Sequence, residues 1–344
     1  MRAVFLTNRE PGGVIVREVP IPERRPGEVL LRIHAAGLNR VDLYMRDSGV
    51  GITHRLPQIM GVEGAGVVVE ADADSGLVIG QKAVIFSNAF CGQCRYCLAG
   101  NQPLCLRSFI MGEHRDGAFA DYVVMPNRCV LPLPDTIDLV YAGVLMAAYH
   151  TAWRMLFGKS VLIAGETVLL VGIGGGVAVA CLQLAKMARA NVIVTSSSDL
   201  KLERAMALGA VAGINYRTQK VSEHALSLTK GEGVDMVIDS VGEASWSESL
   251  RSLRRGGRLV TCGATSGSHP SADLQRMFIR QLEVYGSTGG SLDEARALLR
   301  IFTSGSICPV IDKIFPIENA PAALDYLASS EQFGKVVLSM VPST

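Results

Sequence analysis

Short apolar runs, separated by Pro and Gly, follow one another through the first part of the chain. They span residues 14–16, 29–33, 66–69, 82–86 and 121–124. Apolar runs of this length, bounded by turn residues, are typical of β-strands. The pattern therefore predicts a β-rich region over residues 1–148.

The pattern changes at about residue 149, where apolar strands begin to alternate with helical stretches. We expect strands at 167–171, 192–195 and 234–239, and helices at 178–189 and 200–208. Such alternation predicts βαβ units and a parallel sheet over residues 149–287, and hence an α/β fold class for this part.

The last part of the chain reads as a helix followed by β-type residues. The helical stretch lies at 292–302, and the β-type runs lie at 314–317 and 334–339. We expect residues 288–344 to return to the first domain. A length of 344 residues suits two domains.

Composition narrows the class of protein. The chain is 49% hydrophobic and 19% charged, with a formal net charge of +1. These values are typical of globular proteins, and no run of like charge predicts a nucleic-acid or membrane partner. The apolar stretch at 3–6 is too short for a signal peptide, and four glycines interrupt the uncharged stretch at 167–185. We expect a soluble, cytoplasmic protein.

A glycine-rich segment joins the strand at 167–171 to the helix at 178–189. Glycines at this place permit a tight turn and let backbone N–H groups at a helix start approach a pyrophosphate. A turn that binds nothing is the alternative, but the second strand that follows favours a Rossmann dinucleotide site. Its predicted residues are Gly172, Gly174, Gly175, Gly176 and Val177.

The end of the second strand bears on the choice of nicotinamide cofactor. A carboxylate there would accept a hydrogen bond from the ribose 2′-OH and repel a 2′-phosphate. The chain has Ser196 and Ser197 instead, followed by the cation Lys201. Asp199 argues for NADH, but its place just before Leu200 is better explained as the cap of the next helix. The sequence therefore favours NADPH over NADH.

Four of the 8 cysteines are clustered. Four thiolates in one compact loop form the ligand set of a closed, structural zinc site, and the spacing differs from that of zinc ribbons and ferredoxin-type clusters. We therefore favour zinc over an iron–sulfur cluster at Cys91, Cys94, Cys97 and Cys105. The scattered Cys129, Cys181, Cys262 and Cys308 are expected to be buried thiols.

The glycine turn, the cysteine lobe and the segment Gly-Val-Glu-Gly-Ala-Gly at 61–66 together resemble the medium-chain dehydrogenase/reductase superfamily, which includes zinc alcohol dehydrogenases and quinone oxidoreductases. The resemblance spans essentially the whole chain. It implies a GroES-like β-rich catalytic domain at 1–148 with a zinc lobe at 88–108, a Rossmann domain at 149–287, and an active site between them. It also implies a homodimer or homotetramer.

The residues expected to bind a catalytic zinc ion differ from the family pattern. Asn39 stands where the family has Cys, Gly61-Val62-Glu63 replaces Gly-His-Glu, and the third ligand position falls near Ala147. One carboxylate cannot hold a zinc ion that takes three protein ligands. The resemblance therefore implies a structural zinc ion without a catalytic one.

Asn39, Asp42 and Tyr44 match the Gly-Leu-Asn-x-x-Asp-x-Tyr form of the quinone-reductase branch. By the same likeness Tyr216 would bind NADPH and Thr151 would line the nicotinamide. His54 and Glu63 complete the candidate catalytic residues, and further cofactor contacts are expected from Ser240, Cys262, Gly263 and Lys335. Simpler explanations remain open: Asp42 as a cap or ion-pair partner, Tyr44 and Tyr216 as packed side chains, and His54 as a surface histidine.

The leading hypothesis is an NADPH-dependent reductase of quinones or other conjugated or aryl ketones. Without zinc, substrate conjugation and hydrogen-bond donors must stabilise the developing oxyanion. A zinc alcohol dehydrogenase with unusual ligands, such as His54, is the first alternative. The second is a non-enzymatic NADPH-binding protein.

Overall fold

The computed structural model describes residues 1–49, 52–53 and 55–341. The chain divides into two compact units. Unit 1 contains Met1–His150 and Ser291–Thr344, and unit 2 contains Thr151–Gly290. The C-terminal part of the chain thus belongs to the same unit as the N-terminal part.

Unit 1 is rich in β-strands, as the apolar runs predicted. A three-stranded sheet has the order β2-β1-β4, a larger sheet has the order β10-β6-β5-β3-β18-β17 with β9 also paired to β3, and β7 pairs with β8. The strands are β1 (Arg2–Leu6), β2 (Val14–Glu18), β3 (Glu28–Gly37), β4 (Gln58–Ile59), β5 (Ala65–Glu70), β6 (Lys82–Ile85), β7 (Asn88–Ala89), β8 (Phe109–Ile110), β9 (Tyr122–Pro126), β10 (Val130–Pro132), β17 (Ile311–Pro316) and β18 (Lys335–Ser339).

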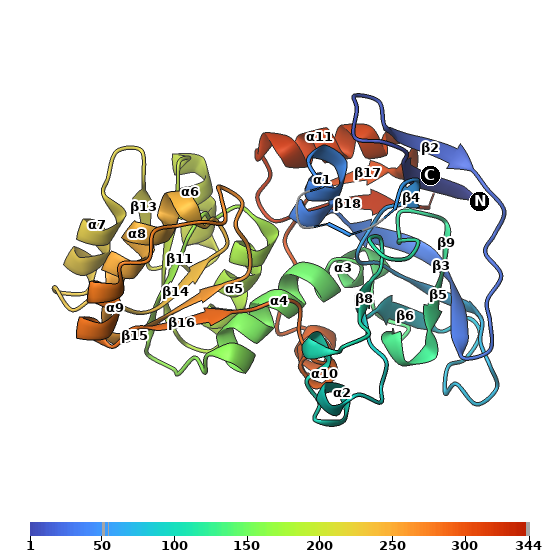
Figure 1. Cartoon of the computed structure of the whole chain (residues 1–344), viewed down its shortest axis with the longest axis horizontal. Coiled ribbons are helices and arrows are strands. Elements are labelled where there is room, and N and C mark those ends of the chain that lie inside the picture. Colours follow the sequence, from blue (N-terminus) through green and yellow to red (C-terminus); the bar gives the residue numbers. More distant parts are fainter. Residues whose placement is uncertain (50–51, 54, 342–344) are drawn as a thin grey trace. The chain divides into compact units, whose positions relative to one another are not determined.

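The helices of unit 1 are mostly short. They are α1 (Arg40–Asp47), α2 (Arg95–Leu98), α3 (Leu139–Ala142), α10 (Leu292–Thr303) and α11 (Ala320–Ser329), with 3-10 turns η1 (Gln102–Leu104), η2 (Asn127–Cys129) and η5 (Ile317–Asn319). Figure 1 shows α11 beside α1 and β2, which it contacts. Ser291 is the N-cap of α10, and its side chain accepts a hydrogen bond from the Glu294 N–H. A capping box therefore fixes the N-terminus of the predicted helix.

The last strand enters the larger sheet between β3 and β17. β18 runs antiparallel to β3, with Val337 opposite Gly37, and parallel to β17. The N–H of Leu38 also donates to the carbonyl of Val336 at 2.9 Å. This register brings Lys335, the first residue of β18, to the end of β3.

A helical segment with π-helical turns extends from Leu145 to Lys159. It comprises η3 (Leu145–Tyr149), α4 (His150–Trp153) and η4 (Arg154–Lys159). π-Turns place one extra residue in a helical turn, so the 3.6-residue period that reveals a helix in a sequence is lost here.

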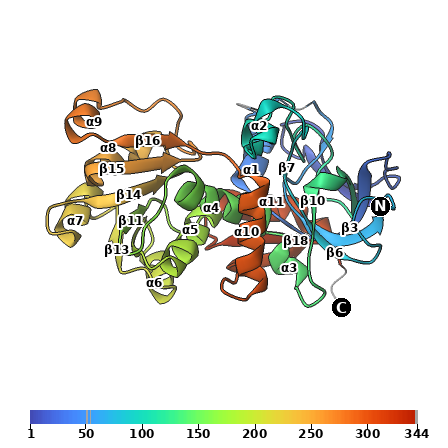
Figure 2. The ribbon, with the colours of Figure 1, turned by 90° about the horizontal axis from the view of Figure 1, so that it is seen from below.

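Unit 2 is built on one parallel six-stranded sheet. Its order β13-β12-β11-β14-β15-β16 is 3-2-1-4-5-6 when the strands are counted along the unit, which confirms the predicted Rossmann topology. The strands are β11 (Thr167–Leu170), β12 (Asn191–Ser196), β13 (Ala212–Asn215), β14 (Val234–Asp239), β15 (Leu253–Thr261) and β16 (Glu283–Gly286). Figure 2 shows β16 and α9 at one end of this sheet.

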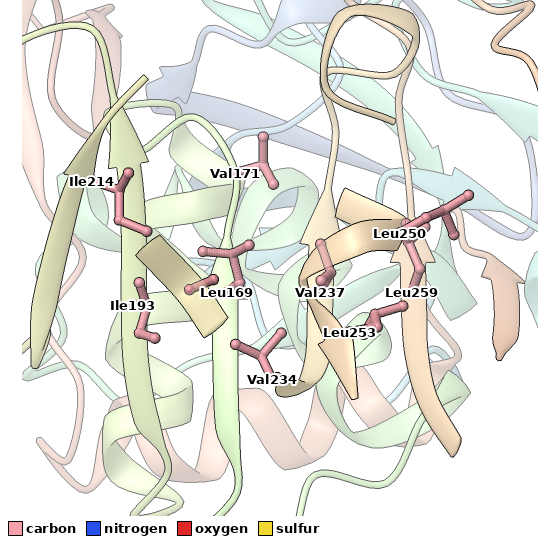
Figure 3. Close-up of a cluster of buried hydrophobic side chains, with 10 residues drawn as sticks. Leu169, Val171, Ile193, Ile214, Val234, Val237, Leu250, Leu253 and Leu259 are labelled. Carbon is pink, nitrogen blue, oxygen red and sulfur yellow. The ribbon is translucent and has the colours of Figure 1, made fainter. Parts of the chain in front are cut away.

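Helices α5 (Gly176–Met187), α6 (Asp199–Ala207), α7 (Val221–Leu228), α8 (Glu243–Ser252) and α9 (Leu274–Arg280) complete unit 2. Apolar side chains of the strands form a buried cluster with residues of α7 and α8, drawn in Figure 3. Leu169, Val234 and Val237 of the central strands are fully buried. This core holds the strands in register, so their carboxyl ends form one fixed edge.

The uncharged stretch at 167–185 is a strand, a turn and the start of a helix, as expected from its glycines. None of the helices formed by the described residues combines the length and apolar character that a membrane crossing requires.

Candidate functional site

The glycine turn of unit 2 has the geometry of a dinucleotide site. Gly172 and Gly174 have φ values of +74° and +119°, which side chains other than that of glycine rarely adopt. Gly175 precedes α5 in an extended conformation, and a Cβ atom there would meet nothing within 4 Å. The first N–H groups of this 12-residue helix, including that of Val177, have no acceptor within the helix, and such groups can bind a pyrophosphate.

Thr195, at the end of β12, holds this turn in place. Its hydroxyl accepts a hydrogen bond from the Gly172 N–H at 3.0 Å, and its carbonyl accepts one from the Ile173 N–H at 2.7 Å. The sequence analysis did not predict this role. The signal was available, because a hydroxyl residue lies on the strand next to the turn.

The serines at the end of β12 and after it are used partly in local structure. Ser196 is buried, and its hydroxyl accepts a hydrogen bond from the Ser198 N–H at 3.1 Å. Ser198 is the N-cap of α6 and accepts from the Lys201 N–H. The expectation that Asp199 caps this helix is therefore wrong: Asp199 lies one residue inside α6, and its carboxylate accepts from the Asn215 amide at 2.7 Å.

Other predicted cofactor residues also lie at or after the carboxyl ends of strands. Tyr216 follows β13 and is 51% exposed, Ser240 follows β14, and Cys262 and Gly263 follow β15. A Cβ atom on Gly263 would lie 3.0 Å from the Ser240 carbonyl, so these two loops touch. Thr151 lies in α4 and is partly buried.

Asp239, which the sequence analysis missed, organises the loop after β14. Its carboxylate accepts hydrogen bonds from the N–H groups of Val241 and Gly242 and from the hydroxyls of Ser245 and Ser249, at 2.7–3.0 Å. Asp239 is fully buried, and these four donors satisfy both of its carboxylate oxygens.

The four clustered cysteines of unit 1 come together around one point. Their sulfur atoms all lie within 4.8 Å of one another. The Sγ atom of Cys97 lies 3.9 Å from that of Cys91 and 3.5 Å from that of Cys94. A tetrahedral zinc ion with Zn–S bonds of about 2.3 Å separates its sulfurs by about 3.8 Å. The four thiols are free, and the geometry fits a structural zinc ion.

Local hydrogen bonds prepare part of the lobe for a metal. N–H groups of Gln93 and Cys94 lower the pKa of Cys91 to about 6, and those of Cys97 and Leu106 lower the pKa of Cys94. Burial raises the pKa of Cys97 to about 12. A bound cation would favour the thiolate of Cys97 and offset this cost.

The four cysteines outside the lobe differ in how far they are buried. Cys129 and Cys181 are buried as expected, Cys262 is partly buried, and Cys308 is exposed. The expectation of a buried thiol is therefore wrong for Cys308, which follows α10 in a loop before β17.

Glu63 lies at the centre of a buried polar cluster in unit 1. Its Oε1 accepts hydrogen bonds from the Lys335 ammonium at 2.8 Å and from the Asn39 amide at 2.9 Å, and its Oε2 accepts one from the Ala147 N–H at 2.8 Å. The Glu63 side chain is 0% exposed and the Lys335 side chain is 3% exposed. A Cβ atom on Gly37 would lie 2.5 Å from Oε1, so glycine at position 37 leaves the carboxylate its place.

The Asn39 amide is also fully engaged. Its Nδ2 donates to Gly37 O at 3.0 Å as well as to Glu63, and its Oδ1 accepts from Lys335. The amide thus has no donor left for a substrate oxygen. Asn39 instead supports Glu63 and precedes α1 as its N-cap residue.

Asp42, in the first turn of α1, is completely buried. Its Oδ2 accepts a hydrogen bond from the Asn39 N–H at 2.7 Å, while Oδ1 has no hydrogen-bond partner among the described residues. Burial raises the pKa of Asp42 to about 7, against the lowering effects of the Asn39 N–H and the Lys335 charge. This carboxyl group is therefore able to change its protonation state near neutral pH.

Three further expectations concern the same unit. Lys335 does not fit a cofactor contact, because its ammonium is buried and its three hydrogens have three acceptors: Glu63, Leu38 O and Asn39 Oδ1. Tyr44 lies on α1, two residues beyond Asp42. His54 lies outside the described residues.

The family resemblance would place zinc ligands at Asn39, Val62 and Ala147. Glu63 is the one carboxylate beside these positions, and both of its oxygens accept hydrogen bonds. Among the described residues, Cys91, Cys94, Cys97 and Cys105 are the one group of three or more His, Cys, Asp or Glu side chains close enough to hold a metal ion.

The fold and these sites define a nicotinamide-dependent oxidoreductase with a cysteine-bound structural zinc lobe. Residues 176–304 match the family model of the zinc-binding dehydrogenases, and residues 25–135 match that of the alcohol dehydrogenase GroES-like domain. The chain belongs to the zinc-type alcohol dehydrogenase family of the medium-chain dehydrogenase/reductase superfamily. This confirms the predicted fold class and the enzymatic nature of the chain, and the non-enzymatic alternative is not retained.

The chain is similar to several members over nearly its whole length. It is 33% identical to a zinc-type alcohol dehydrogenase-like protein of Schizosaccharomyces pombe over 94% of both chains. A crystal structure of an NAD-dependent alcohol dehydrogenase has a TM-score of 0.94 and 36% identity, covering 99% of this chain and 100% of the other. A putative zinc-binding dehydrogenase of Sinorhizobium meliloti bound to NADP has a TM-score of 0.88 and 28% identity, covering 98% of both.

Metal analysis of the purified protein is expected to find one zinc ion per subunit, and Cys94→Ser is expected to remove it, because a structural site needs all four thiolates. Cys308→Ser, which changes an exposed cysteine outside the lobe, is the control and should retain the zinc. Two zinc ions per subunit, one of them surviving Cys94→Ser, would contradict this prediction.

The raised pKa of Asp42 makes the free energy of unfolding depend on pH. The folded protein holds a proton on Asp42 up to about pH 7, whereas the unfolded chain releases it near pH 4. Between these values the folded state binds more protons, so stability falls as the pH rises. In urea unfolding from pH 5 to pH 8, wild type should lose on the order of 2 kcal/mol relative to Asp42→Asn.

The exposed variant Asp293→Asn provides the control for the general effect of pH on unfolding. If wild type and Asp42→Asn lose stability in parallel over this range, the buried carboxyl group does not titrate as described.

Proposed function

We propose that the chain is an NADPH-dependent reductase of conjugated or aryl carbonyl compounds, quinones among them, and that it works without a catalytic zinc ion. The observation that carries the proposal is the buried ion pair between Glu63 and Lys335, which engages the one carboxylate beside the expected ligand positions. The unit 2 turn supports the cofactor part, through Gly172, Gly174 and the start of α5.

The cofactor, when bound, supplies the hydride. The chain's own groups must hold the substrate carbonyl and meet the negative charge that develops on its oxygen. With no metal beside that oxygen, the barrier is lower for substrates that spread the charge over a conjugated system. The second carboxyl group of the cluster, Asp42, can hold or release a proton near neutral pH.

NADPH is the proposed cofactor because no carboxylate follows β12 at Ser196 and Ser197, and because Lys201 lies in the first turn of α6. Asp199 is a nearby negative charge, but its carboxylate is hydrogen-bonded to Asn215. One structural relative is bound to NADP and another is named as NAD-dependent, so the relatives allow either cofactor.

A zinc-dependent alcohol dehydrogenase is the second candidate function. The names of the relatives support this candidate better than they support quinone reduction. It requires metal ligands other than those expected by resemblance. His54, the histidine considered for this role, lies outside the described residues.

The resemblance to the medium-chain dehydrogenase/reductase superfamily supports a homodimer or homotetramer that acts on a small-molecule carbonyl substrate.

Lys201→Ala is expected to weaken NADPH binding by roughly 1–3 kcal/mol, the range for a lost charge-assisted hydrogen bond, with little change for NADH. Fluorescence titration of both cofactors at equal ionic strength measures this difference. Lys186→Ala, on α5 of the same unit, is the matched control and should leave both affinities unchanged. Equal losses for the two cofactors would show that Lys201 does not contact the 2′-phosphate.

Steady-state rates on a quinone, an aryl ketone and a primary alcohol should separate the two candidate functions. The zinc-free mechanism predicts turnover of the quinone and the aryl ketone, near inactivity on the alcohol, and no acute effect of a chelator. Faster turnover of the alcohol, lost at once on brief chelation, would establish the zinc-dependent alternative instead. Slow inactivation by chelator is compatible with the first candidate, because structural zinc stabilises the fold.

A further inference from the structure

Unit 2 contains a cavity at the amino-terminal edge of its sheet. Thr167 begins β11, Asn191 begins β12 and Ala212 begins β13, and all three residues line this cavity. Its volume is ≈ 610 Å³, within the range of roughly 300–1,000 Å³ that is typical of small-molecule sites. We call it the N-edge cavity. Because Gly172 follows the opposite end of β11, the N-edge cavity is separate from the glycine turn of the dinucleotide site.

Part of the lining of the N-edge cavity is apolar. Ile193 and Ala212 are paired across β12 and β13, and Val211 and Leu228 complete this apolar part. Ile193 is 2% exposed and belongs to the core cluster drawn in Figure 3, whereas Val211 and Leu228 are 56% and 51% exposed. Two large aliphatic side chains thus face water beside a formed cavity, and an apolar ligand group would cover them.

A turn after α7 forms one wall of the cavity. The hydroxyl of Thr229 accepts a hydrogen bond from the Gly233 N–H at 2.9 Å. Lys230, Gly231 and Gly233 have φ values of +55°, +90° and +98°. A Cβ atom on Gly233 would lie 2.7 Å from the backbone nitrogen of Arg254, so glycine lets the turn pack against the start of β15. The backbone of this wall is therefore formed before any ligand binds.

Arg254 brings a guanidinium group to the same cavity. Its Nε donates to Asp235 Oδ1 at 2.5 Å, and its Nη1 donates to the Arg255 carbonyl at 2.6 Å. The other carboxylate oxygen of Asp235 accepts a hydrogen bond from the Thr167 N–H at 2.7 Å. Both oxygens of Asp235 are thus satisfied within unit 2. Nη2 of Arg254 has no hydrogen-bond partner among the described residues, so it can donate to an anion in the cavity.

Lys230 and Glu232 carry opposite charges on the turn. Both residues line the cavity, and both are exposed. Within the part of the chain that the structure describes, neither side chain forms a hydrogen bond or an ion pair, with the other or with a third residue. A cationic donor and an anion two positions apart complement a ligand that itself carries both charges.

We propose that the N-edge cavity binds a small zwitterion with an apolar body, of which an aliphatic α-amino acid is the simplest. The carboxylate of the ligand accepts hydrogen bonds from Lys230 and Arg254, and its ammonium group donates to Glu232. Its side chain covers Val211 and Leu228. The site lies wholly within unit 2 and does not rest on the proposed reductase function.

Isothermal titration calorimetry with four related probes tests each part of this inference. L-Leucine carries both charges and an isobutyl group, 4-methylpentanoate lacks the ammonium group, 3-methylbutylamine lacks the carboxylate, and glycine lacks the apolar body. We expect saturable binding of L-leucine and roughly fivefold weaker binding of each other probe, the upper range for an exposed ion pair. Saturating NADPH should leave the affinity for L-leucine unchanged, because the two sites are separate.

Two variants assign the charges. Glu232→Gln should lower the affinity for L-leucine to that for 4-methylpentanoate, without weakening the binding of 4-methylpentanoate itself. Lys230→Gln should weaken both ligands and leave 3-methylbutylamine unchanged. Lys220→Gln is the matched control, because Lys220 is an exposed lysine at the opposite end of α7, and it should retain the wild-type affinities. Both substituted positions are exposed, so the melting temperatures of the free variants should stay close to that of wild type.

Four results would each overturn the inference. Equal affinity of wild type for L-leucine and 4-methylpentanoate would remove the role of Glu232. Unchanged affinity for L-leucine in both variants would place the ligand elsewhere, and loss of L-leucine binding in saturating NADPH would place it in the cofactor site. The absence of saturable binding in the millimolar range would make the cavity a surface hollow only. The proposed reductase function is tested separately through turnover and zinc content, on which none of these binding measurements depends.

Discussion

The buried pairing of Lys335 with Glu63 is the constraint on which unit 1 depends. An ion pair withdrawn from water is stable only when both partners have their remaining hydrogen bonds satisfied, and here Asn39, Leu38 and Ala147 supply them. If one of these groups moved away, a buried polar partner would lose its hydrogen bond. The end of β3, the start of α1 and the first residue of β18 are therefore fixed relative to one another.

The two units show different degrees of predictability. In unit 2 the alternation of strands and helices and the glycine turn are local signals, and they led to the observed Rossmann topology. The cysteine lobe was also predictable as a site, because its ligands lie close together in the sequence. Helix α11 was missed although Pro321 lies in its first turn, which is a recognised signal for a helix start.

The polar cluster could not be predicted in the same way. Lys335 and the Leu38 carbonyl are 297 positions apart, and no periodic pattern connects them. Asn39 and Glu63 were identified as candidates, but their partner Lys335 was assigned to the cofactor, although it is buried. Lys335 is buried because β18 lies between β3 and β17 in the sheet. This position of β18 is a feature of the tertiary structure that no local sequence pattern predicts.

The central place of β18 has a consequence for biosynthesis. Unit 2 is one continuous stretch, so all its strands are available before the C-terminal part of the chain has been translated. The larger sheet of unit 1, in contrast, lacks two of its strands, β17 and β18, until residues 311–339 have been translated. Because domains fold as units once their sequence is present, the enzyme should acquire its dinucleotide fold first and complete its N-terminal unit last.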